Sequence, residues 1–174
     1  AVAQDHTVLE ATARARAEQV ANSILVGDEA RIREVAQEHG ISLEGHRIIN
    51  RTEDIQAALT AVELVSSGEA DIVMKGYIHT DDFLRAVLNK EKGLRTGVLM
   101  SHVFVLELRN RDRFLLITDG AMNISPTLED KARIVLNAVH LAHVLGFEEP
   151  RVASLAAVEL LNPAMPATVD ATCL

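Results

Sequence analysis

Two basic side chains lie where a chain turn leaves room for an anion. Lys75 follows the apolar run 71–74 and precedes Gly76, while Arg95 lies in the glycine-flanked stretch 93–97. A lysine holds phosphate as a point charge, whereas the planar guanidinium of arginine grips phosphate or carboxylate with two parallel hydrogen bonds. These residues therefore indicate candidate anion sites. The structural alternatives are a solvated lysine and a surface arginine in a turn.

A polar loop within residues 114–127 has more hydrogen-bonding groups than most structural turns need. An apolar run ends there and a helix begins, with the carboxylate of Asp119 and the amide of Asn123 in between. Ligands of α/β proteins collect beyond the carboxyl ends of strands, and helix N-termini bind anions. Ser125 and Pro126 fit the N-cap and the first position of the helix, and Asp119 fits a turn cap. Asn123 is therefore the residue of this loop that most needs a ligand.

The first 75 residues alternate between helical and strand patterns with short connections. Asp28 fits the N-cap of one predicted helix, and Gly40 and Gly68 fit helix ends. Such alternation is typical of a mainly parallel sheet that helices cover on both faces. The predicted helices span 4–21, 31–37 and 54–66, the last with Ile55, Leu59, Val62 and Val65 on one side, and the predicted strands span 24–27, 46–49 and 71–74.

The pattern changes after residue 96. The apolar runs 97–108 and 113–118 flank the polar stretch 109–112, which predicts a hairpin and hence an antiparallel pair in the same sheet. The later predictions are a helix after Pro126 that ends near Gly146, with Leu128, Ala132, Val135, Leu136 and Val139 on its apolar stripe, a strand at 151–158, and a helix after Pro163 with Thr168 as its cap.

Together these elements predict an α/β fold, a three-layer α/β/α sandwich around a mainly parallel mixed sheet. Residues 1–148 are predicted to form an N-terminal α/β domain, and residues 149–174 the start of a second α/β domain that is truncated. Only four residues follow Asp170 in what reads as a helix, and residue 1 is not a methionine. We therefore expect the chain to be the first part of a longer protein.

The composition argues against several classes of function. The formal net charge is −8 over 174 residues, whereas nucleic-acid binders usually display a basic stripe, so no nucleic-acid partner is expected. No stretch approaches the roughly 20 apolar residues of a membrane helix, and no signal-peptide pattern opens the chain, which predicts a cytoplasmic protein without a membrane partner. Zinc-site spacings and phosphate-loop motifs are missing. Small anionic ligands stay compatible, because a few local cations and amides suffice to bind them.

Several ordered motifs resemble one family, the phosphate acetyl/butyryl transferases, and within it the phosphate butyryltransferase branch. The resemblance spans nearly the whole chain, and the order of the motifs makes it more specific than any one of them. The matching stretches are 70–76 with His79 and Thr80, then 94–97, 118–126, and 150–153 with Glu159, Asn162, Pro163 and Asp170.

The resemblance implies reversible transfer of an acyl group from coenzyme A to inorganic phosphate, without a metal or an organic cofactor. Phosphate attacks the thioester carbonyl directly in a ternary complex, so the site must hold two anions and stabilise an oxyanion. The acyl group is acetyl, butyryl or a branched short chain. The implied fold is similar to isocitrate and isopropylmalate dehydrogenases, with two domains flanking a cleft, and the implied assembly is a homodimer or larger homo-oligomer.

The resemblance also implies which residues bind the substrates. Arg95 is expected to bind phosphate or coenzyme A with Lys75 beside it, while hydroxyl and amide groups orient phosphate or the carbonyl. A later family signature has no matching residues here, so no catalytic residue is assigned and the chain alone is expected to lack transfer activity. The expected substrate-binding residues are Lys75, Gly76, His79, Thr80, Arg95, Thr96, Asp119, Asn123, Ser125 and Thr127.

Two other functions are compatible with the sequence. A metal-dependent decarboxylating dehydrogenase of similar fold needs clustered aspartates for a divalent ion, and the pair Asp81 and Asp82 fits a helix start instead. The other is a non-catalytic module that binds phosphate or coenzyme A. Such a module predicts thermal stabilisation by coenzyme A without formation of an acyl phosphate.

Overall fold

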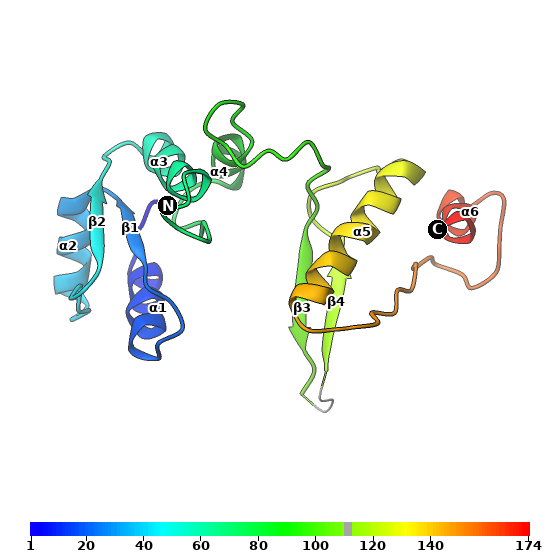
Figure 1. The fold of residues 1–174 in the computed structure, drawn as a ribbon, viewed down its shortest axis with the longest axis horizontal. Helices are drawn as coiled ribbons and strands as arrows, with labels where there is room; N and C mark the ends of the chain where they lie inside the picture. The colour runs from blue at the N-terminus through cyan, green and yellow to red at the C-terminus, as the bar shows by residue number, and fades with distance from the viewer. Residues whose placement is uncertain (110–112) are drawn as a thin grey trace. The chain divides into compact units, whose positions relative to one another are not determined.

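The structure is a computed structural model that describes residues 1–109 and 113–174. It divides into two compact units, Ala1–Thr96 and Gly97–Leu174, here called unit 1 and unit 2. Each unit combines helices with one small sheet, so the predicted mixed α/β class is confirmed (Figure 1). The described strands form two separate two-stranded sheets. The layered sandwich and the domain boundary after residue 148 stay predictions.

Unit 1 is built around a parallel pair of strands. Strand β1 (Ile24–Gly27) pairs with β2 (Arg47–Asn50) in a register that places Ile24 opposite Arg47 and Gly27 opposite Asn50. The side chain of Asp28 accepts hydrogen bonds from the next helix, which confirms its predicted cap role. The elements are α1 (His6–Ala17), β1 (Ile24–Gly27), α2 (Glu29–Glu38), β2 (Arg47–Asn50), α3 (Asp54–Ser66) and α4 (Thr80–Val87).

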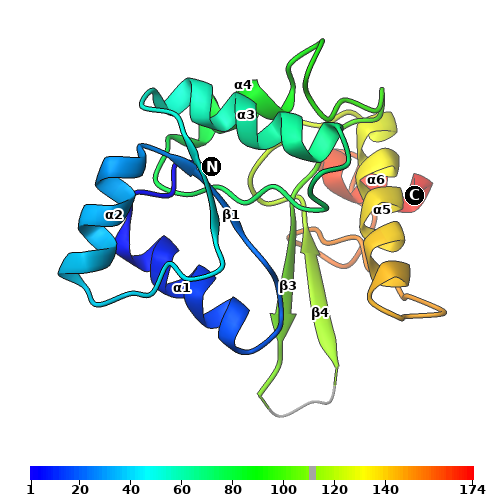
Figure 2. The same ribbon diagram turned by 60° about the vertical axis from the view of Figure 1, so that its left-hand side comes forward.

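The core of unit 1 lies between β1 and the first two helices. Leu9 of α1, Leu25 of β1 and Ile32 of α2 are almost completely buried in one apolar cluster. Helix α3 packs beside α4, as Figures 1 and 2 both show. The predicted buried side of α3 is wrong at Ile55, which is 54% exposed. The helix instead buries a face of small residues, because alanines allow close packing: Ala57, Ala58 and Ala61, with Val62 and Leu64.

The predicted strand at 71–74 is wrong. Ile72 is 83% exposed and Met74 is 58% exposed, and the backbone beyond them bonds to the start of the chain. The N–H of Gly76 donates to the carbonyl of Ala1 at 2.8 Å, and Tyr77 donates to Val2 at 3.1 Å. An apolar run predicts burial but does not identify the partner of its backbone. Here that partner is an irregular segment, so no ladder forms.

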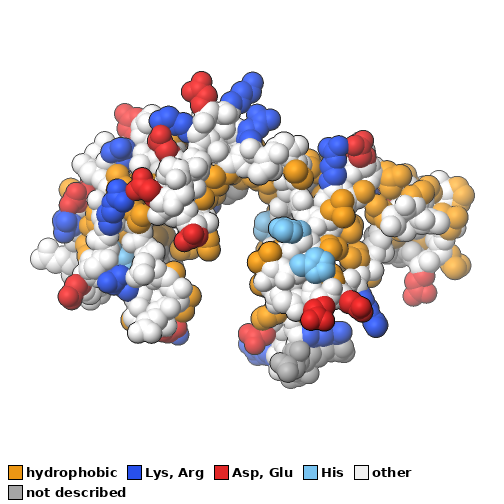
Figure 3. Space-filling model, in the orientation of Figure 1, with side chains coloured by type: hydrophobic (Ala, Val, Ile, Leu, Met, Phe, Trp, Pro, Cys, Tyr) orange, Lys and Arg blue, Asp and Glu red, His pale blue; other side chains and the backbone are white. Residues whose placement is uncertain are grey.

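Unit 2 is built on a hairpin with a long helix beside it. Strands β3 (Val103–Glu107) and β4 (Phe114–Thr118) pair antiparallel, which confirms the predicted hairpin pair. Among the described residues this pair forms a sheet of its own, so its predicted place in the same sheet as the first strands is wrong. The predicted loop 109–112 lies, apart from Arg109, outside the described residues. Helix α5 (Leu128–Val144) contacts β4, and α6 (Pro166–Cys173) follows an irregular segment. In Figure 3 hydrophobic side chains are frequent around α5 and α6, whereas charges of both signs mix over unit 1.

Three local predictions for unit 2 need correction. Residues 151–158 form no strand and are exposed, because no neighbouring strand in the described chain takes up their backbone bonds. Leu136 is 67% exposed, and the buried residues of α5 are Ile134 and Ala142. Thr168 lies inside α6, since Pro166 occupies the first helical position and begins the helix earlier.

No helix in the part of the chain that the structure describes is long and apolar enough to cross a membrane.

Candidate functional site

The loop that carries Lys75 packs closely against the first residues of the chain. A Cβ atom on Gly76 would lie 2.2 Å from the carbonyl oxygen of Val2, so only glycine permits this approach. The N–H of Gly76 is already bonded to Ala1. Lys75 is exposed, and its Nζ lies 3.4 Å from the carbonyl oxygen of Gly76. The ammonium therefore faces solvent with one long contact, while Gly76 has a packing reason of its own.

Helix α4 begins immediately after this loop. His79 is the N-cap residue of α4, and its side chain makes no cap hydrogen bond. No N-cap side chain therefore accepts a hydrogen bond from the first backbone N–H groups of the helix. Such a terminus attracts anions. The carboxylates of Asp81 and Asp82 in the first turn already offset part of the positive end of the helix dipole. Thr80 is the first helical residue and is exposed, so its hydroxyl can reach a ligand.

Arg95 lies in an exposed turn whose start is anchored. Leu94 donates its N–H to the carbonyl of Val87 at 2.8 Å. A Cβ on Gly93 would lie 2.3 Å from the carbonyl oxygen of Asn89, so the turn packs tightly on the end of α4. Arg95 and Thr96 themselves are exposed.

Arg95 and Lys75 differ from most cations of unit 1 in having no carboxylate partner among the described residues. Their charges are therefore available to an anionic ligand rather than neutralised within the protein. The cations of unit 1 that do form ion pairs with carboxylates are Arg14, Arg31, Arg33, Arg47, Arg85 and Lys92.

In unit 2 the carboxylate of Asp119 organises the loop after β4. One oxygen accepts the N–H groups of Ala121 and Met122, each at 2.9 Å. The other accepts the Asn123 amide at 2.5 Å and the backbone N–H of His102 at 3.4 Å. Partial burial alone would raise the pKa of Asp119, but these hydrogen bonds outweigh it and lower the pKa to about 2. Asp119 is thus ionised at neutral pH, and its carboxylate holds the loop in shape through these hydrogen bonds.

The side-chain amide of Asn123 forms hydrogen bonds within the protein. Its amide nitrogen donates to the carbonyl of Met100 at 3.1 Å and to the carboxylate of Asp119. Both amide hydrogens therefore have partners, and the loop explains Asn123 without a ligand on that nitrogen.

The start of α5 corrects another prediction. Thr127, not Ser125, is the N-cap, and it forms a capping box with Asp130. The Thr127 hydroxyl and N–H groups bond the carboxylate at 2.7 and 3.1 Å and lower the pKa of Asp130. A capping box gives hydrogen-bond partners to two backbone N–H groups at once, whereas a lone serine cap serves fewer. The N-cap therefore lies at Thr127 rather than two residues earlier. Ser125 is exposed, and in the described chain its hydroxyl makes no hydrogen bond.

Replacing Thr127 with alanine is expected to lower the free energy of unfolding by about 1 kcal/mol, because the first turn of α5 loses its cap. Urea unfolding followed by circular dichroism measures this change. Ser125→Ala is the matched control and should leave the unfolding midpoint where it is. Equal losses in the two variants would contradict the assignment of the cap to Thr127.

The predicted substrate-binding residues fall into two groups. Unit 1 holds Lys75, Gly76, His79, Thr80, Arg95 and Thr96, and unit 2 holds Asp119, Asn123, Ser125 and Thr127. Within unit 2 the structure joins Asp119 directly to Asn123. In unit 1, no hydrogen bond between described residues links the Lys75 loop to the Arg95 turn. Substrate binding by any of these residues stays a prediction.

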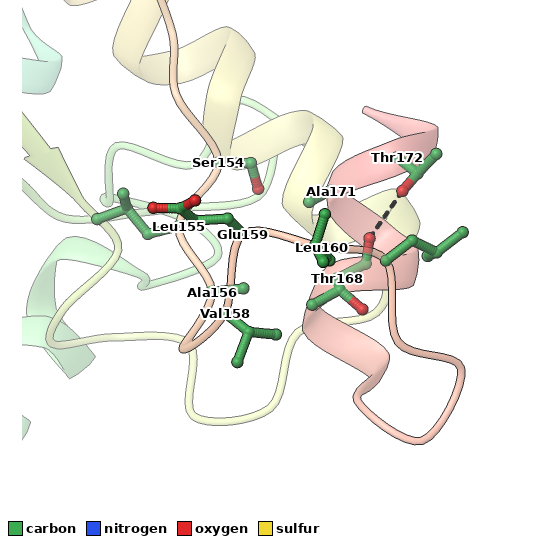
Figure 4. A pocket seen from close by; sticks show the side chains of 10 residues that line it. Ser154, Leu155, Ala156, Val158, Glu159, Leu160, Thr168, Ala171 and Thr172 are labelled. Carbon is green, nitrogen blue, oxygen red and sulfur yellow. Dashed lines mark hydrogen bonds between the residues drawn. The ribbon is translucent and has the colours of Figure 1, made fainter.

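Two shallow cavities lie in unit 2. One of about 330 Å³ is lined by residues 154–156 and 158–161 and by one side of α6, where the Thr172 hydroxyl donates to the Thr168 carbonyl (Figure 4). The other, of about 370 Å³, lies between α5 and the segment before β3, with Ser101 and Asn137 in its wall. None of the predicted substrate-binding residues lines either cavity.

Asn137 was not predicted as a site residue from the spacing of polar residues. The Asn137 amide donates to the Leu99 carbonyl at 2.8 Å and to the Ser101 hydroxyl at 2.9 Å. A signal was present, because asparagine disfavours helix interiors and here it interrupts an apolar helical stretch. At the end of the same segment, the Nδ1 of His102 is buried with no hydrogen-bond partner in the described residues.

The chain is similar to known proteins along its whole length. It is 51% identical over 174 residues to phosphate butyryltransferase of Clostridium acetobutylicum, covering 100% of this chain and 58% of that protein. It is 41% identical to phosphate acetyltransferase of Thermotoga maritima, covering 100% of this chain and 59% of that protein. The chain therefore spans less than two thirds of the length of these relatives.

A solved structure and a family model agree with these relatives. The crystal structure of a branched-chain phosphotransacylase from Enterococcus faecalis V583 matches with a TM-score of 0.82 and 31% identity, covering 99% of this chain and 60% of that one. The model of the phosphate acetyl/butaryl transferase family matches residues 1–60 and 51–173. With nearly every residue covered by that match, the chain belongs to the phosphate acetyl/butaryl transferase family.

Proposed function

We propose that the protein containing this chain transfers a short acyl group between coenzyme A and inorganic phosphate. The observation that carries the proposal is 51% identity, along the full chain, to a phosphate butyryltransferase. In the forward direction a phosphate oxygen attacks the thioester carbonyl carbon, the carbon–sulfur bond breaks, and the thiolate leaves and takes up a proton. The products are an acyl phosphate and free coenzyme A.

This reaction needs cations that are not already neutralised. Phosphate and coenzyme A are both anions, and a further negative charge develops on the carbonyl oxygen during the reaction. Arg95 and Lys75 are exposed and lack carboxylate partners in the described chain, which supports a role for both in anion binding. Arg95 suits phosphate best because its guanidinium forms two parallel hydrogen bonds.

The remaining residues of unit 1 act near these cations. We assign phosphate or carbonyl hydrogen bonds to the hydroxyls of Thr80 and Thr96, which are exposed. His79 adds a ring nitrogen at the uncapped start of α4. Gly76 contributes by letting the Lys75 loop pack against residue 2, which sets where that loop can go.

In unit 2 the proposed roles are mostly indirect. Asp119 and Asn123 use their polar groups to hold the loop after β4, so they act by shaping it. Thr127 caps α5. Ser125 is exposed and, unlike Thr127, its hydroxyl has no hydrogen-bond partner among the described residues, so it is the proposed direct contact of the loop with phosphate or the carbonyl.

Family membership supports several wider features of the proposal. We propose that the whole protein has the two-domain arrangement of isocitrate and isopropylmalate dehydrogenases, works in the cytoplasm as a homodimer or larger homo-oligomer, and needs no metal or organic cofactor. The relatives described above are a phosphate butyryltransferase, a phosphate acetyltransferase and a phosphotransacylase, which supports acyl transfer over a decarboxylating dehydrogenase.

A thioester-release assay tests the proposal. The protein, expressed with any further residues that its gene encodes, is mixed with acetyl, butyryl or branched-chain acyl coenzyme A in phosphate buffer. We expect phosphate-dependent release of free thiol with a matching yield of acyl phosphate, and the fastest thioester identifies the substrate. Stabilisation by coenzyme A without any acyl phosphate would favour a non-catalytic binding module instead and overturn the proposal.

A further inference from the structure

The chain between α4 and Arg95 forms one tight turn within unit 1. The N–H of Gly93 donates to the carbonyl of Asn89 at 3.2 Å, which is the four-residue spacing of a helical turn. The N–H of Leu94 then donates at 2.8 Å to the carbonyl of Val87, the last residue of α4. Arg95 follows Leu94 directly, so two backbone hydrogen bonds fix the chain immediately before it.

The side chain of Asn89 caps this turn. Its Oδ1 accepts the N–H groups of Glu91 and Lys92, each at 3.0 Å. The first N–H groups of a helical turn lack carbonyl partners within the turn, and an asparagine at the N-cap position supplies an acceptor for them. Asn89 is half-buried, and its own N–H donates to the carbonyl of Ala86 at 3.2 Å, so the capping residue is attached to α4.

The turn is packed so closely that its backbone has little freedom. A Cβ atom on Gly93 would lie 2.3 Å from the carbonyl oxygen of Asn89 and 2.5 Å from that of Val87. Both obstacles are backbone atoms, which cannot swing aside as the end of a flexible side chain can. The course of the chain into Arg95 is therefore sensitive to any change in the shape of the turn.

Helix α3 also contacts the turn, but through weaker bonds. The Ser66 hydroxyl donates to the carbonyl of Lys92 at 3.1 Å, yet it is shared with the carbonyl of Glu63 at 3.2 Å. The Lys92 ammonium lies 2.9 Å from the Glu63 carboxylate, and exposed ion pairs of this kind contribute little. Among the described side chains, Asn89 therefore makes the strongest contribution to the shape of the turn.

We propose that Asn89 is a positioning residue for Arg95. By accepting two N–H groups of the turn, Asn89 fixes the backbone that presents the guanidinium to the anionic substrate. A displacement of about 1 Å in a substrate-binding group can cost up to about a hundredfold in rate, so the shape of the turn matters for catalysis. The inference rests on the proposed function, and it assigns Asn89 a role that acts through Arg95 rather than by contact with substrate.

Three variants test the role of the cap. Asn89→Ala removes the acceptor, whereas Asn89→Ser replaces it with a hydroxyl that caps helical turns about as well and adds no charge. The matched control is Asn50→Ala. The Asn50 Oδ1 accepts the N–H of Glu29 at 3.1 Å, so this variant also deprives a backbone N–H group of unit 1 of its acceptor, but at the start of α2 rather than in the turn.

Hydrogen exchange and steady-state kinetics are measured on the same protein as in the thioester-release assay. Exchange at the Glu91 and Lys92 amides reports the turn, and kcat/KM with phosphate and acyl coenzyme A varied in turn reports the site. For Asn89→Ala we expect about fivefold faster exchange, the factor that loss of a typical cap gives, and about a fivefold loss of kcat/KM. Asn89→Ser and Asn50→Ala should stay within about twofold of wild type in both measurements.

A double-mutant cycle separates positioning from a general loss of stability. If Asn89 acts through Arg95, adding Asn89→Ala to Arg95→Ala should cause no further loss of kcat/KM, because the group that the turn positions is already gone. A purely structural role would lower the rate by the same factor in both backgrounds.

Each other outcome overturns a specific statement. Unchanged exchange in Asn89→Ala means that Asn89 does not hold the turn. Faster exchange with unchanged kcat/KM, or equal losses in the two backgrounds, means that the cap is structural only. In these cases an active wild type leaves the proposed function standing and overturns this inference alone. A wild-type protein that forms no acyl phosphate overturns the proposed function, and this inference with it.

Discussion

Replacing Arg95 with alanine is expected to lower kcat/KM for acyl transfer between tenfold and a hundredfold. A charge-assisted hydrogen-bond pair to an anion contributes about 1.5–3 kcal/mol, and each 1.36 kcal/mol is about a tenfold change in rate. Arg95 is exposed and has no carboxylate partner in the described chain, so its full charge is available to the substrate. Initial rates with phosphate and acyl coenzyme A varied in turn show which substrate loses affinity.

The matched control for Arg95→Ala is Arg85→Ala. It removes the same charge from the neighbouring helix α4, but Arg85 is paired with Asp82 at 3.0 Å. Its effect on kcat/KM should stay below about twofold, since exposed ion pairs contribute little. Arg95→Lys should fall between the two, because lysine keeps the charge but loses the two-pronged geometry. If Arg95→Ala behaves like Arg85→Ala, Arg95 does not bind the substrate.

Local signals in the sequence predicted those elements whose ends are set by nearby residues. The span of α3 matches the predicted 54–66, and Asp28 caps α2 as predicted. Caps and glycine stops act within one helical turn, so their partners are visible in the sequence. The predicted start of α5 was wrong, although its signals are also local. Two local signals competed there, and Thr127 with Asp130 satisfies more donors than Ser125 does.

Burial and strand formation were harder to predict, because they depend on partners far along the chain. The run 71–74 has the composition of a strand, yet the backbone just after it bonds to residues 1 and 2. In α3 the large residue Ile55 was expected inside, but the close packing of the helix selects a face of alanines. Periodicity identifies a helix more reliably than it identifies which face is buried.

The roles of the polar loop were hidden for a related reason. Asp119 and Asn123 were singled out because a dense group of polar residues suggested a ligand. Their partners, the backbone groups of His102 and Met100, lie 17 and 23 residues earlier. The hairpin register, which pairs Val103 with Thr118, brings those groups together. Without that register, the sequence alone does not show whether these polar groups bind a ligand or bond to one another and to the backbone.

Removing the charge of Asp119 is expected to destabilise unit 2. Asp119→Asn keeps the shape but weakens the bonds to Ala121, Met122 and His102, and we expect a loss of about 1–2 kcal/mol in unfolding free energy at pH 7, a value reduced for the partial exposure of the carboxylate. Glu148→Gln is the control, because it removes one exposed charge from the same unit. Urea unfolding measures both variants.

The pH dependence of that difference identifies its cause. Burial opposes ionisation of Asp119, but the loop hydrogen bonds lower its pKa from the ordinary value of 3.8 to about 2 in the folded chain. A group whose folded pKa is lowered stabilises the protein fully above its unfolded pKa, and that stabilisation is lost as the pH falls through the folded value. The gap between wild type and Asp119→Asn should therefore be constant from pH 7 to about pH 5 and shrink from pH 4 towards pH 2. A gap that stays constant down to pH 2.5, or one no larger than that of Glu148→Gln at pH 7, would show that the charge of Asp119 does not hold the loop.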